Sequence, residues 1–269
     1  IGTGIHQMPG RTPAMAAMSA LTIDHLSGGR FRLGVGVSGP QVAEGWHGQT
    51  FDDPLGRTRE YMEIVRDVLR RKEPVTASGP HYPLPVGKGR ALSTNVRPLR
   101  TDLPIYLAAM GPRNVALAAE IADGWLSLFF SPEHVDAFEL PALPDGFDVA
   151  PMVRVAIDDD IAAARDALRP TVAMYVGSYG SRGANFYGDL VVRFGFGDAA
   201  HAIQDAALEG RRDDAIAAVP DALIDAVALV GPREAVRDRL AAFADAGVTT
   251  LLAHTNDATT IRALAEAAS

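Results

Sequence analysis

Residues 104–126 read PIYLAAMGPRNVALAAEIADGWL, and they carry the signals of a strand, a turn, a helix and a second strand. Residues 105–108 form a short apolar run entered through a proline, which is typical of a parallel strand buried on both faces. Gly111-Pro112 then turns the chain, and proline suits the first helical position because no backbone donor is needed there. The stretch therefore predicts a strand–helix–strand unit of an α/β fold.

The segment after this turn has the spacing of a helix with a very small apolar face. The residues on that face are Val115, Ala118, Ala119 and Ala122. So small a face allows the helix to lie close to the sheet, with its free backbone N–H groups just beyond the end of the strand. Two interpretations stay open: an anion-binding site at the helix start, or an ordinary strand-to-helix turn.

Composition excludes several classes of protein. The chain has 269 residues, 48% of them hydrophobic, which is enough for one large α/β domain or two small ones. The net charge is −8 and no basic block occurs, so neither nucleic acid nor an anionic membrane is an expected partner. No apolar run is long enough to span a bilayer and no signal peptide is evident, so we expect a soluble, cytoplasmic protein.

Metal and thiol chemistry are also disfavoured. There is no cysteine, which rules out disulfides, thiolate metal sites and a cysteine nucleophile. The seven histidines include no pair at the spacing of a helical zinc motif, so no metal is expected. No Ser-His-Asp order or paired-carboxylate motif supports a hydrolase.

Strand and helix patterns alternate along the chain, which predicts a parallel sheet covered by helices. The strands are expected at residues 1–5, 31–35, 105–108, 125–130, 152–157 and 248–253. Six strands fall short of the eight of a closed (β/α)8 barrel, which leaves an N-terminally incomplete barrel or an open doubly wound sheet. Because the chain begins with Ile1 in a strand-like segment, we expect a truncated N-terminus.

We expect a single domain over residues 1–269, with two departures from the repeating unit. Residues 75–102 are rich in proline and glycine and predict a surface excursion, either a lid or an inserted loop without chemistry. Residues 161–230 predict a helical insertion. The helix after Thr12-Pro13 is expected to bury one face, formed by Met15, Met18, Leu21 and Leu26.

A dinucleotide-binding fold is the rival interpretation, because residues 34–39 read GVGVSG and fit GxGxxG after a strand. That fold needs a helix directly after Gly39 and an acidic residue at the end of a second strand. Here Pro40 follows, and Glu60 lies in a helical pattern, so the rival is disfavoured.

Several separate segments resemble the luciferase-like monooxygenase superfamily, and more narrowly its actinobacterial coenzyme F420-dependent oxidoreductases. They include residues 2–31, 33–48, 54–71, 104–126, 185–196, 219–232 and 246–252. The resemblance covers essentially the whole chain. It implies a (β/α)8 barrel with an insertion after the seventh strand, residues 1–5 being the third strand and the first two βα units being absent. The unpaired edges of such a barrel could be covered by a second copy, so a homo-oligomer is left open.

The resemblance places the deazaflavin across the carboxyl ends of the strands, where backbone atoms can approach a flat ring closely. It also implies a non-prolyl cis peptide bond between Gly4 and Ile5. The cofactor contacts that it implies are Gly4, Ile5, Gly36, Ser38, Ala108, Ala109, Met110 and Gly111. Arg113 and Asn114, at the start of the helix, are candidates to bind a phosphate of the cofactor tail.

Three titratable residues on loops after strands are candidates to donate or accept a proton beside the ring: His6, Glu44 and His47. Each is equally compatible with a loop side chain that hydrogen-bonds only to backbone. Trp46 is a candidate apolar wall for the substrate, and Arg182 and Tyr187 are candidate contacts to the substrate or the cofactor tail.

Three functions remain in competition at this stage. The first is hydride transfer between coenzyme F420 and a small organic substrate, which the resemblance favours. The second is an FMN-dependent monooxygenase on the same fold. The third is an incomplete barrel without catalytic activity. The substrate cannot be read from the sequence, because its pocket is built by variable loops.

Overall fold

A computed structural model describes residues 1–180 and 183–268 of the chain. By their internal contacts the residues fall into two compact units. The first unit comprises Ile1–Ala109 with Leu117–Trp125, and the second comprises Met110–Ala116 with Leu126–Ser269. The single domain expected from the sequence stays a prediction. No helix among the described residues is long and apolar enough to cross a membrane.

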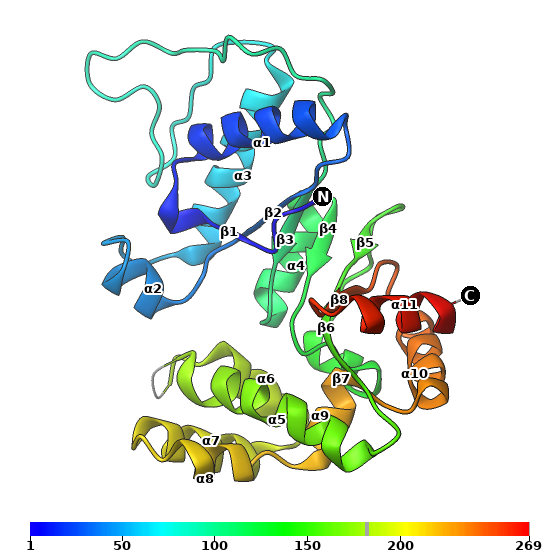
Figure 1. Ribbon diagram of the computed structural model, residues 1–269. Helices are drawn as coiled ribbons and strands as arrows, with labels where there is room; N and C mark the ends of the chain where they lie inside the picture. Colours follow the sequence, from blue (N-terminus) through cyan, green and yellow to red (C-terminus); the bar gives the residue numbers. More distant parts are fainter. Residues whose placement is uncertain (181–182, 269) are drawn as a thin grey trace. The chain divides into compact units, whose positions relative to one another are not determined.

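The first unit is built on short parallel strands. Its strands are β1 (His6–Gln7), β2 (Leu33–Gly36), β3 (Ile105–Ala108) and β4 (Gly124–Leu126), side by side in that order (Figure 1). Residue His6 pairs with Val35, and Val35 pairs in turn with Leu107, so the carboxyl ends of β1, β2 and β3 are level. Every residue of β2 is buried, as expected of a strand covered on both faces.

Helices α1 (Pro13–Ser27) and α3 (Pro54–Arg70) pack against each other in this unit. The Thr12 hydroxyl accepts a hydrogen bond from the Met15 N–H at 3.4 Å, and the Asp53 carboxylate caps α3 through the Gly56 N–H. An apolar stripe at helical spacing on α3 is buried throughout. Its members are Tyr61, Ile64, Val65, Val68 and Leu69.

The predicted buried face of α1 is wrong for three of its four residues. Met15, Met18 and Leu26 are exposed, and only Leu21 is buried. The residues that α1 buries instead are Ala16, Ala17, Ala20, Leu21 and Asp24. Small side chains allow close helix packing, so the alanines, and not the methionines, form the contact face.

A buried ion pair ties the end of α1 to the start of β2. The side chain of Asp24 is 2% exposed and lies 2.9 Å from Nη2 of Arg100, which also donates to the Phe31 carbonyl. The Asp24 carboxylate accepts a further hydrogen bond from the Phe31 N–H. Because a buried carboxylate needs such partners, Asp24 is part of the architecture rather than a functional site.

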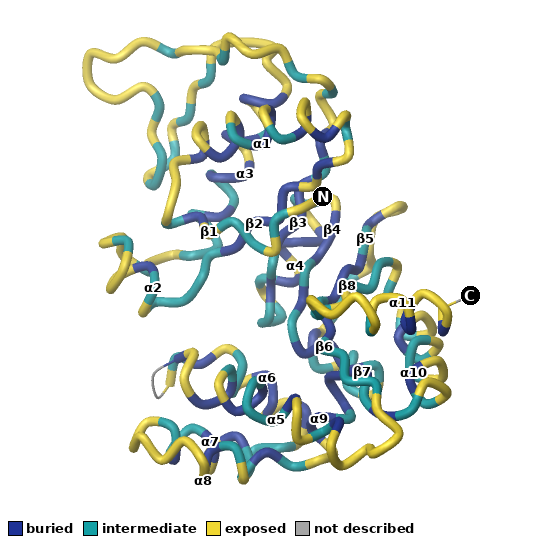
Figure 2. Tube along the Cα trace, viewed as in Figure 1, coloured by how far each residue is buried: buried dark blue, intermediate teal, exposed yellow. Residues whose placement is uncertain are grey.

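The segment between α3 and β3 is irregular and mostly exposed (Figure 2). Isolated bridges pair Val75 with Leu92 and Ala77 with Leu84. One carboxylate holds the segment to α3, because Glu60 accepts hydrogen bonds from the N–H groups of His81 and Tyr82 at 2.9 and 3.0 Å.

The second unit has its own parallel sheet, with β6 (Met152–Ile157) between β7 (Ala228–Gly231) and β8 (Leu252–His254). The short strand β5 (Asp148–Val149) precedes β6. The remaining elements are η2 (Pro132–Phe138), α5 (Ile161–Ser178), α6 (Phe186–Arg193), α7 (Gly197–Leu208), α8 (Arg212–Ala217), α9 (Asp221–Val227), α10 (Arg233–Asp245) and α11 (Ala258–Ala267).

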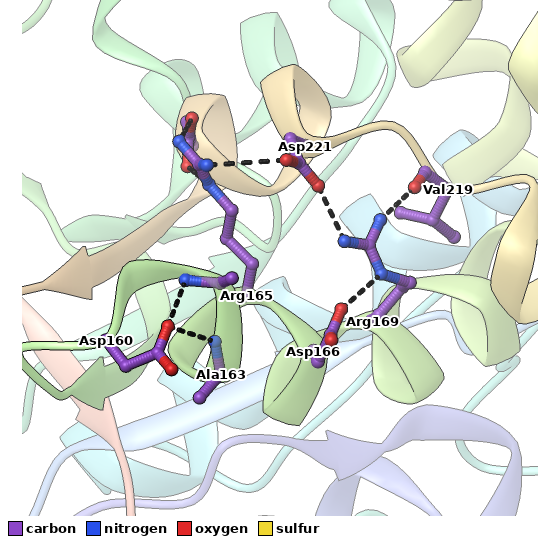
Figure 3. Close-up of polar contacts among 9 residues, drawn as sticks. Asp160, Ala163, Arg165, Asp166, Arg169, Val219 and Asp221 are labelled. Atoms are coloured by element: carbon purple, nitrogen blue, oxygen red, sulfur yellow. Dashed lines mark hydrogen bonds and ion pairs between the residues drawn. The ribbon is translucent and has the colours of Figure 1, made fainter.

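Ion pairs fasten α5 to α9 (Figure 3). Arg165 contacts both Asp221 and Asp225, the latter through two hydrogen bonds of 2.8 and 2.6 Å. Arg169 contacts Asp221 at 2.6 Å and also donates to the Val219 carbonyl. The helices of this region are therefore joined by a charge network as well as by apolar contacts.

Several predicted elements differ from the structure. The strand predicted at 125–130 ends at Leu126, and the one predicted at 248–253 begins only at Leu252. Residues 161–230 were predicted as a helical insertion, but their end forms part of β7, an apolar run too short to be told from a helix by periodicity. Residues 1–5 contribute only the bridge of Gly2 to Arg32, and β1 begins at His6. A short helix, α2 (Pro40–Gly45), follows Gly39 directly, because a proline is accepted at the first helical position.

Candidate functional site

Four of the predicted cofactor residues lie together in the first unit: Gly36 and Ala108 end β2 and β3, and Gly4 and Ile5 directly precede β1. A β-carbon on Gly36 would lie 2.3 Å from Cδ1 of Ile5 and 3.2 Å from Cβ of Ala108, so a larger residue there would displace the Ile5 side chain. The peptide bond between Gly4 and Ile5 is cis, which confirms that prediction. Gly36 and Ala108 present only small groups at the ends of β2 and β3, and backbone without a bulky side chain is what a flat ligand can approach closely.

His6 lies beside this cluster with its ring half-buried. Its Nε2 atom is buried and has no hydrogen-bond partner among the described residues. Burial, and secondarily the Arg11 guanidinium, lower the pKa of His6 below its ordinary 6.5. A neutral imidazole with one unsatisfied nitrogen can accept or donate a proton, so His6 has the chemistry expected of a candidate acid or base.

His47 reaches the same edge of the sheet. Its Nε2 lies 3.2 Å from the amide oxygen of Gln7, the residue that follows His6. Its ring also packs beside Gly10, since a β-carbon there would lie 3.1 Å from Cε1 of His47. The structure therefore places the His47 ring beside Gln7, the residue that follows His6 in β1.

Two neighbouring candidates are in less favourable positions. Glu44 accepts a hydrogen bond from the Phe51 N–H at 3.1 Å, so its carboxylate organises the loop before α3. Trp46 is 82% exposed and contributes no buried wall. Ser38 has a left-handed backbone, with φ of 63°, which turns the chain after β2.

The end of β3 is held by a side chain that sequence reasoning did not single out. The indole N–H of Trp125, whose side chain is buried, donates to the Ala109 carbonyl at 2.9 Å. This bond orients one of the predicted cofactor contacts. Trp125 was assigned only as a strand residue, because a tryptophan in an apolar run gives no signal of its hydrogen-bond partner.

The predicted tail-binding turn lies in the second unit, at the start of α4 (Pro112–Ile121). The Gly111 carbonyl accepts hydrogen bonds from the N–H groups of Asn114 and Val115, both at 3.0 Å. The first turn therefore offers fewer free donors than the sequence suggested, and the exposed Arg113 is the main positive group there. No heavy atom lies within 4 Å of a β-carbon built on Gly111, so the space beside it is open.

Arg193, at the end of α6, is a second contact that the sequence did not indicate. Its Nη2 donates to the Met110 carbonyl at 3.0 Å, and its Nε donates to the Ala137 carbonyl. The predicted cofactor residue Met110 is thereby tied to the helical insertion within the second unit.

Tyr187 belongs to a cluster of aromatic rings in the second unit. Its ring centroid lies 4.9 Å from that of Tyr175, 5.9 Å from Tyr179 and 5.8 Å from Phe129. Burial raises the pKa of the Tyr187 hydroxyl. The other candidate in this segment, Arg182, lies outside the described residues.

Among the described residues, no group of three histidine, aspartate or glutamate side chains could hold a metal ion. The groups that the structure places at the ends of β1 to β3 are a half-buried imidazole and closely packed backbone. That arrangement suits the binding and orientation of an organic cofactor.

The family model described as luciferase-like monooxygenase matches residues 1–250. The chain is 44% identical, over 98% of its length and 81% of the relative's, to a Mycobacterium tuberculosis protein named as a coenzyme F420-dependent oxidoreductase. It is 30% identical to a 5,10-methylenetetrahydromethanopterin reductase of Archaeoglobus fulgidus, covering 94% of this chain and 76% of that protein.

Solved structures show the same fold. The coenzyme F420-dependent tetrahydromethanopterin reductase of Methanopyrus kandleri matches with a TM-score of 0.77 at 25% identity, over 98% of this chain and 79% of that one. An F420-dependent secondary alcohol dehydrogenase matches with a TM-score of 0.68 at 19% identity, over 94% and 72% of the two chains, which is a likeness of fold alone. The α/β fold of barrel type predicted from the sequence is confirmed.

Proposed function

The chain belongs to the luciferase-like monooxygenase family, and we propose that it transfers a hydride between coenzyme F420 and a small organic substrate. The observation that carries the proposal is the 44% identity, over 98% of the chain, to a protein named as an F420-dependent oxidoreductase. The reductase relative at 30% identity supports the same cofactor.

The residues at the ends of β1 to β3 fit a flat deazaflavin. Gly36 and Ala108 present only small groups at the ends of β2 and β3, and the Ile5 side chain packs against Gly36. The buried Nε2 of His6 has no partner among the described residues, and an additional ligand atom could satisfy it. The unsatisfied nitrogen of His6 favours a ligand with a polar edge over a purely apolar one.

We assign the proposed contacts accordingly. In the first unit, the residues that would support the ring are Gly4, Ile5, Gly36, Ser38, Ala108 and Ala109. In the second unit, Met110, Gly111, Arg113 and Asn114 are kept as contacts to the cofactor on the basis of the family resemblance. When bound, the deazaflavin would supply or accept a hydride at one ring carbon.

The chain's own contribution to the chemistry is orientation and a proton. His6 is neutral near pH 7, because burial lowers its pKa, and its Nε2 can hold or release a proton beside the strand ends. His47 is the second candidate, because its Nε2 contacts the side chain of Gln7, the neighbour of His6 in the chain. The carboxylate of Glu44 is the weakest of the three, because it already accepts a backbone hydrogen bond.

A cofactor titration tests the proposal. The full chain is mixed separately with F420 and FMN, and binding is followed by quenching of cofactor fluorescence and by retention on a desalting column. We expect binding of F420 and none of FMN. Retention of FMN without F420 binding would favour a flavin monooxygenase instead, and binding of neither would favour a catalytically inactive protein.

A substrate screen then tests the reaction class. Oxidation of reduced F420 is followed against enones, imines and quinones, with the Gly36→Val variant as the control. The added side chain should collide with Ile5 and Ala108 and abolish turnover. Bound F420 that no compound of the three classes oxidises would argue against hydride transfer to these substrates.

A further inference from the structure

A cavity opens in the first unit beyond the carboxyl ends of β1 and β2. It is a partly open cavity, and its volume of about 570 Å³ includes the solvent space at its mouth. The residues that line it come from the loops after these strands, the start of α3 and the excursion before β3. They are Met8, Pro9, Arg11, Thr12, Val37, Ala43, Gln49, Thr50, Phe51, Asp52, Pro54, Arg57 and Tyr82.

Much of the lining is apolar. Met8 and Ala43 are 2% and 1% exposed, so they are fixed parts of the core at the base of the cavity. The ring of Tyr82 packs edge-on against the buried ring of Tyr61, with the ring centroids 5.7 Å apart. These surfaces can accept the hydrocarbon part of a ligand.

The charged groups of the lining are unevenly paired. Arg57 is 19% exposed, lies 2.8 Å from Asp52 and stands over the Tyr82 ring at 5.9 Å, so its charge is matched by the carboxylate. Arg11 also lines the cavity, and among the described residues no carboxylate forms an ion pair with it. The lining therefore has an excess of one positive charge.

We propose that this cavity binds a small molecule with an apolar body and a single carboxylate, which Arg11 recognises. A guanidinium binds a carboxylate through two parallel hydrogen bonds, and one unpaired arginine matches one negative charge. A phosphate monoester carries close to two charges at neutral pH and exceeds that excess. The apolar lining then selects a hydrocarbon or aromatic body over a small hydrophilic acid.

The position of the cavity connects it with the proposed chemistry. Met8 is two residues from His6, and Arg11 is close enough to His6 to lower its pKa. A carboxylate on Arg11 would therefore hold its apolar body near the ends of β1 and β2. The binding site is argued from the cavity alone, whereas its role as the substrate site rests on the proposed function.

Calorimetric titration of the full chain without cofactor tests the binding. The probes are hydrocinnamate, its neutral amide hydrocinnamamide, and phenyl phosphate. We expect hydrocinnamate to bind about 10- to 100-fold more tightly than the amide, which is the range for a hydrogen-bonded charge pair. Equal binding of acid and amide, or tighter binding of phenyl phosphate, would overturn the assignment.

Variants locate the effect. Arg11→Gln should bind acid and amide equally, and Arg11→Glu should prefer the cation phenylpropylamine, while Arg90→Gln, an exposed arginine outside the lining, keeps the preference for acid. Melting curves check that each variant is folded. A preference for acid that survives in a folded Arg11→Gln protein contradicts the proposal.

The experiments distinguish failure of the proposed carboxylate site from failure of the proposed F420-dependent function. Loss of the carboxylate preference in a chain that binds F420 and oxidises its reduced form would overturn the cavity assignment alone. Failure to bind F420 in a chain that still prefers hydrocinnamate would overturn the proposed function and leave the carboxylate site in place.

Discussion

His6 is the residue whose surroundings give it the most distinctive chemistry. Folding lowers its pKa from 6.5 through burial and the nearby Arg11 charge. Between the lowered value and 6.5 the unfolded chain binds the proton more readily than the folded chain does. The stability that neutral His6 contributes is therefore fully present above pH 6.5 and is lost as the pH falls through the folded-state pKa.

The first prediction concerns this pH dependence. His6→Gln cannot titrate, so the free energy of unfolding of the wild type should fall relative to the variant as the pH is lowered from about 8 to about 5. Denaturant melts of both proteins across that range measure the difference. Curves that stay parallel at every pH would mean that His6 has the same pKa in the folded and unfolded chain.

Arg113 decides whether the start of α4 binds the anionic part of a cofactor. Because Asn114 and Val115 donate to the Gly111 carbonyl, the exposed guanidinium is the main attractive group left at this turn. Arg113→Ala should weaken F420 binding by about 1–2 kcal/mol and leave turnover at saturating cofactor within a few-fold. Fluorescence titration followed by saturated kinetics, with Arg90→Ala as the control, measures both.

One outcome would change the role proposed for Arg113. An Arg113→Ala protein that binds F420 normally but turns over about a hundredfold more slowly would have lost an interaction made only in the transition state. Arg113 would then face the substrate and not the tail.

At the scale of elements, Glu60 links the irregular segment before β3 to α3. It accepts two backbone hydrogen bonds, and a β-carbon on Gly79 would lie 2.2 Å from its carboxyl carbon. Glu60→Ala leaves both N–H groups unpaired, which costs about 1–3 kcal/mol locally. Trypsin should therefore cleave the segment at Lys88 or Arg90 faster in the variant.

The matched control for this experiment is Glu63→Ala, an exposed glutamate on the same helix. It should leave the cleavage rate unchanged. Equal protection of Glu60→Ala and wild type would show that the segment is held by its other contacts. Glu60→Ala should also weaken hydrocinnamate binding, because Glu60 holds the backbone of Tyr82, which lines the cavity.

The ion pairs between α5 and α9 make a further prediction at this scale. Arg169 is 17% exposed and bonds to Asp221, to Asp166 and to the Val219 carbonyl (Figure 3). Arg169→Met keeps the aliphatic stem and removes these bonds, so it should lower the free energy of unfolding by about 1–2 kcal/mol. Denaturant melts measure the loss.

Arg212→Met is the control, because Arg212 is exposed on α8 and should change stability by less than about 0.5 kcal/mol. If both variants are equally stable, the network is no stronger than isolated surface pairs.

At the scale of the whole molecule, net charge opposes the approach of an anionic ligand. The chain carries −8 at neutral pH, with 33 acidic against 25 basic residues. Raising the ionic strength from about 0.01 M to about 0.15 M shortens the Debye length from about 30 Å to about 8 Å. We therefore expect F420 to associate faster at the higher salt concentration, as measured by stopped-flow quenching.

Slower association of F420 at the higher salt concentration would contradict this expectation. The local arginines would then dominate the field that an incoming anion meets, and the net charge of the chain would have little influence on the rate.

The sequence alone determined the features that depend on residues near one another in the chain. The strand, turn and helix at 104–126, the cap at Thr12 and the stripe on α3 all follow from local backbone chemistry and helical spacing. The cis bond at Gly4-Ile5 was expected from the family resemblance.

Only the tertiary structure decided the features that join distant segments. It buries the alanines of α1 in place of Met15 and Met18, and places the indole of Trp125 on the Ala109 carbonyl. It also brings Arg11, Arg57 and Tyr82 to one cavity, from three separate parts of the chain. Periodicity states which residues share a face, but the partner of that face depends on packing across the sheet, which no local pattern encodes.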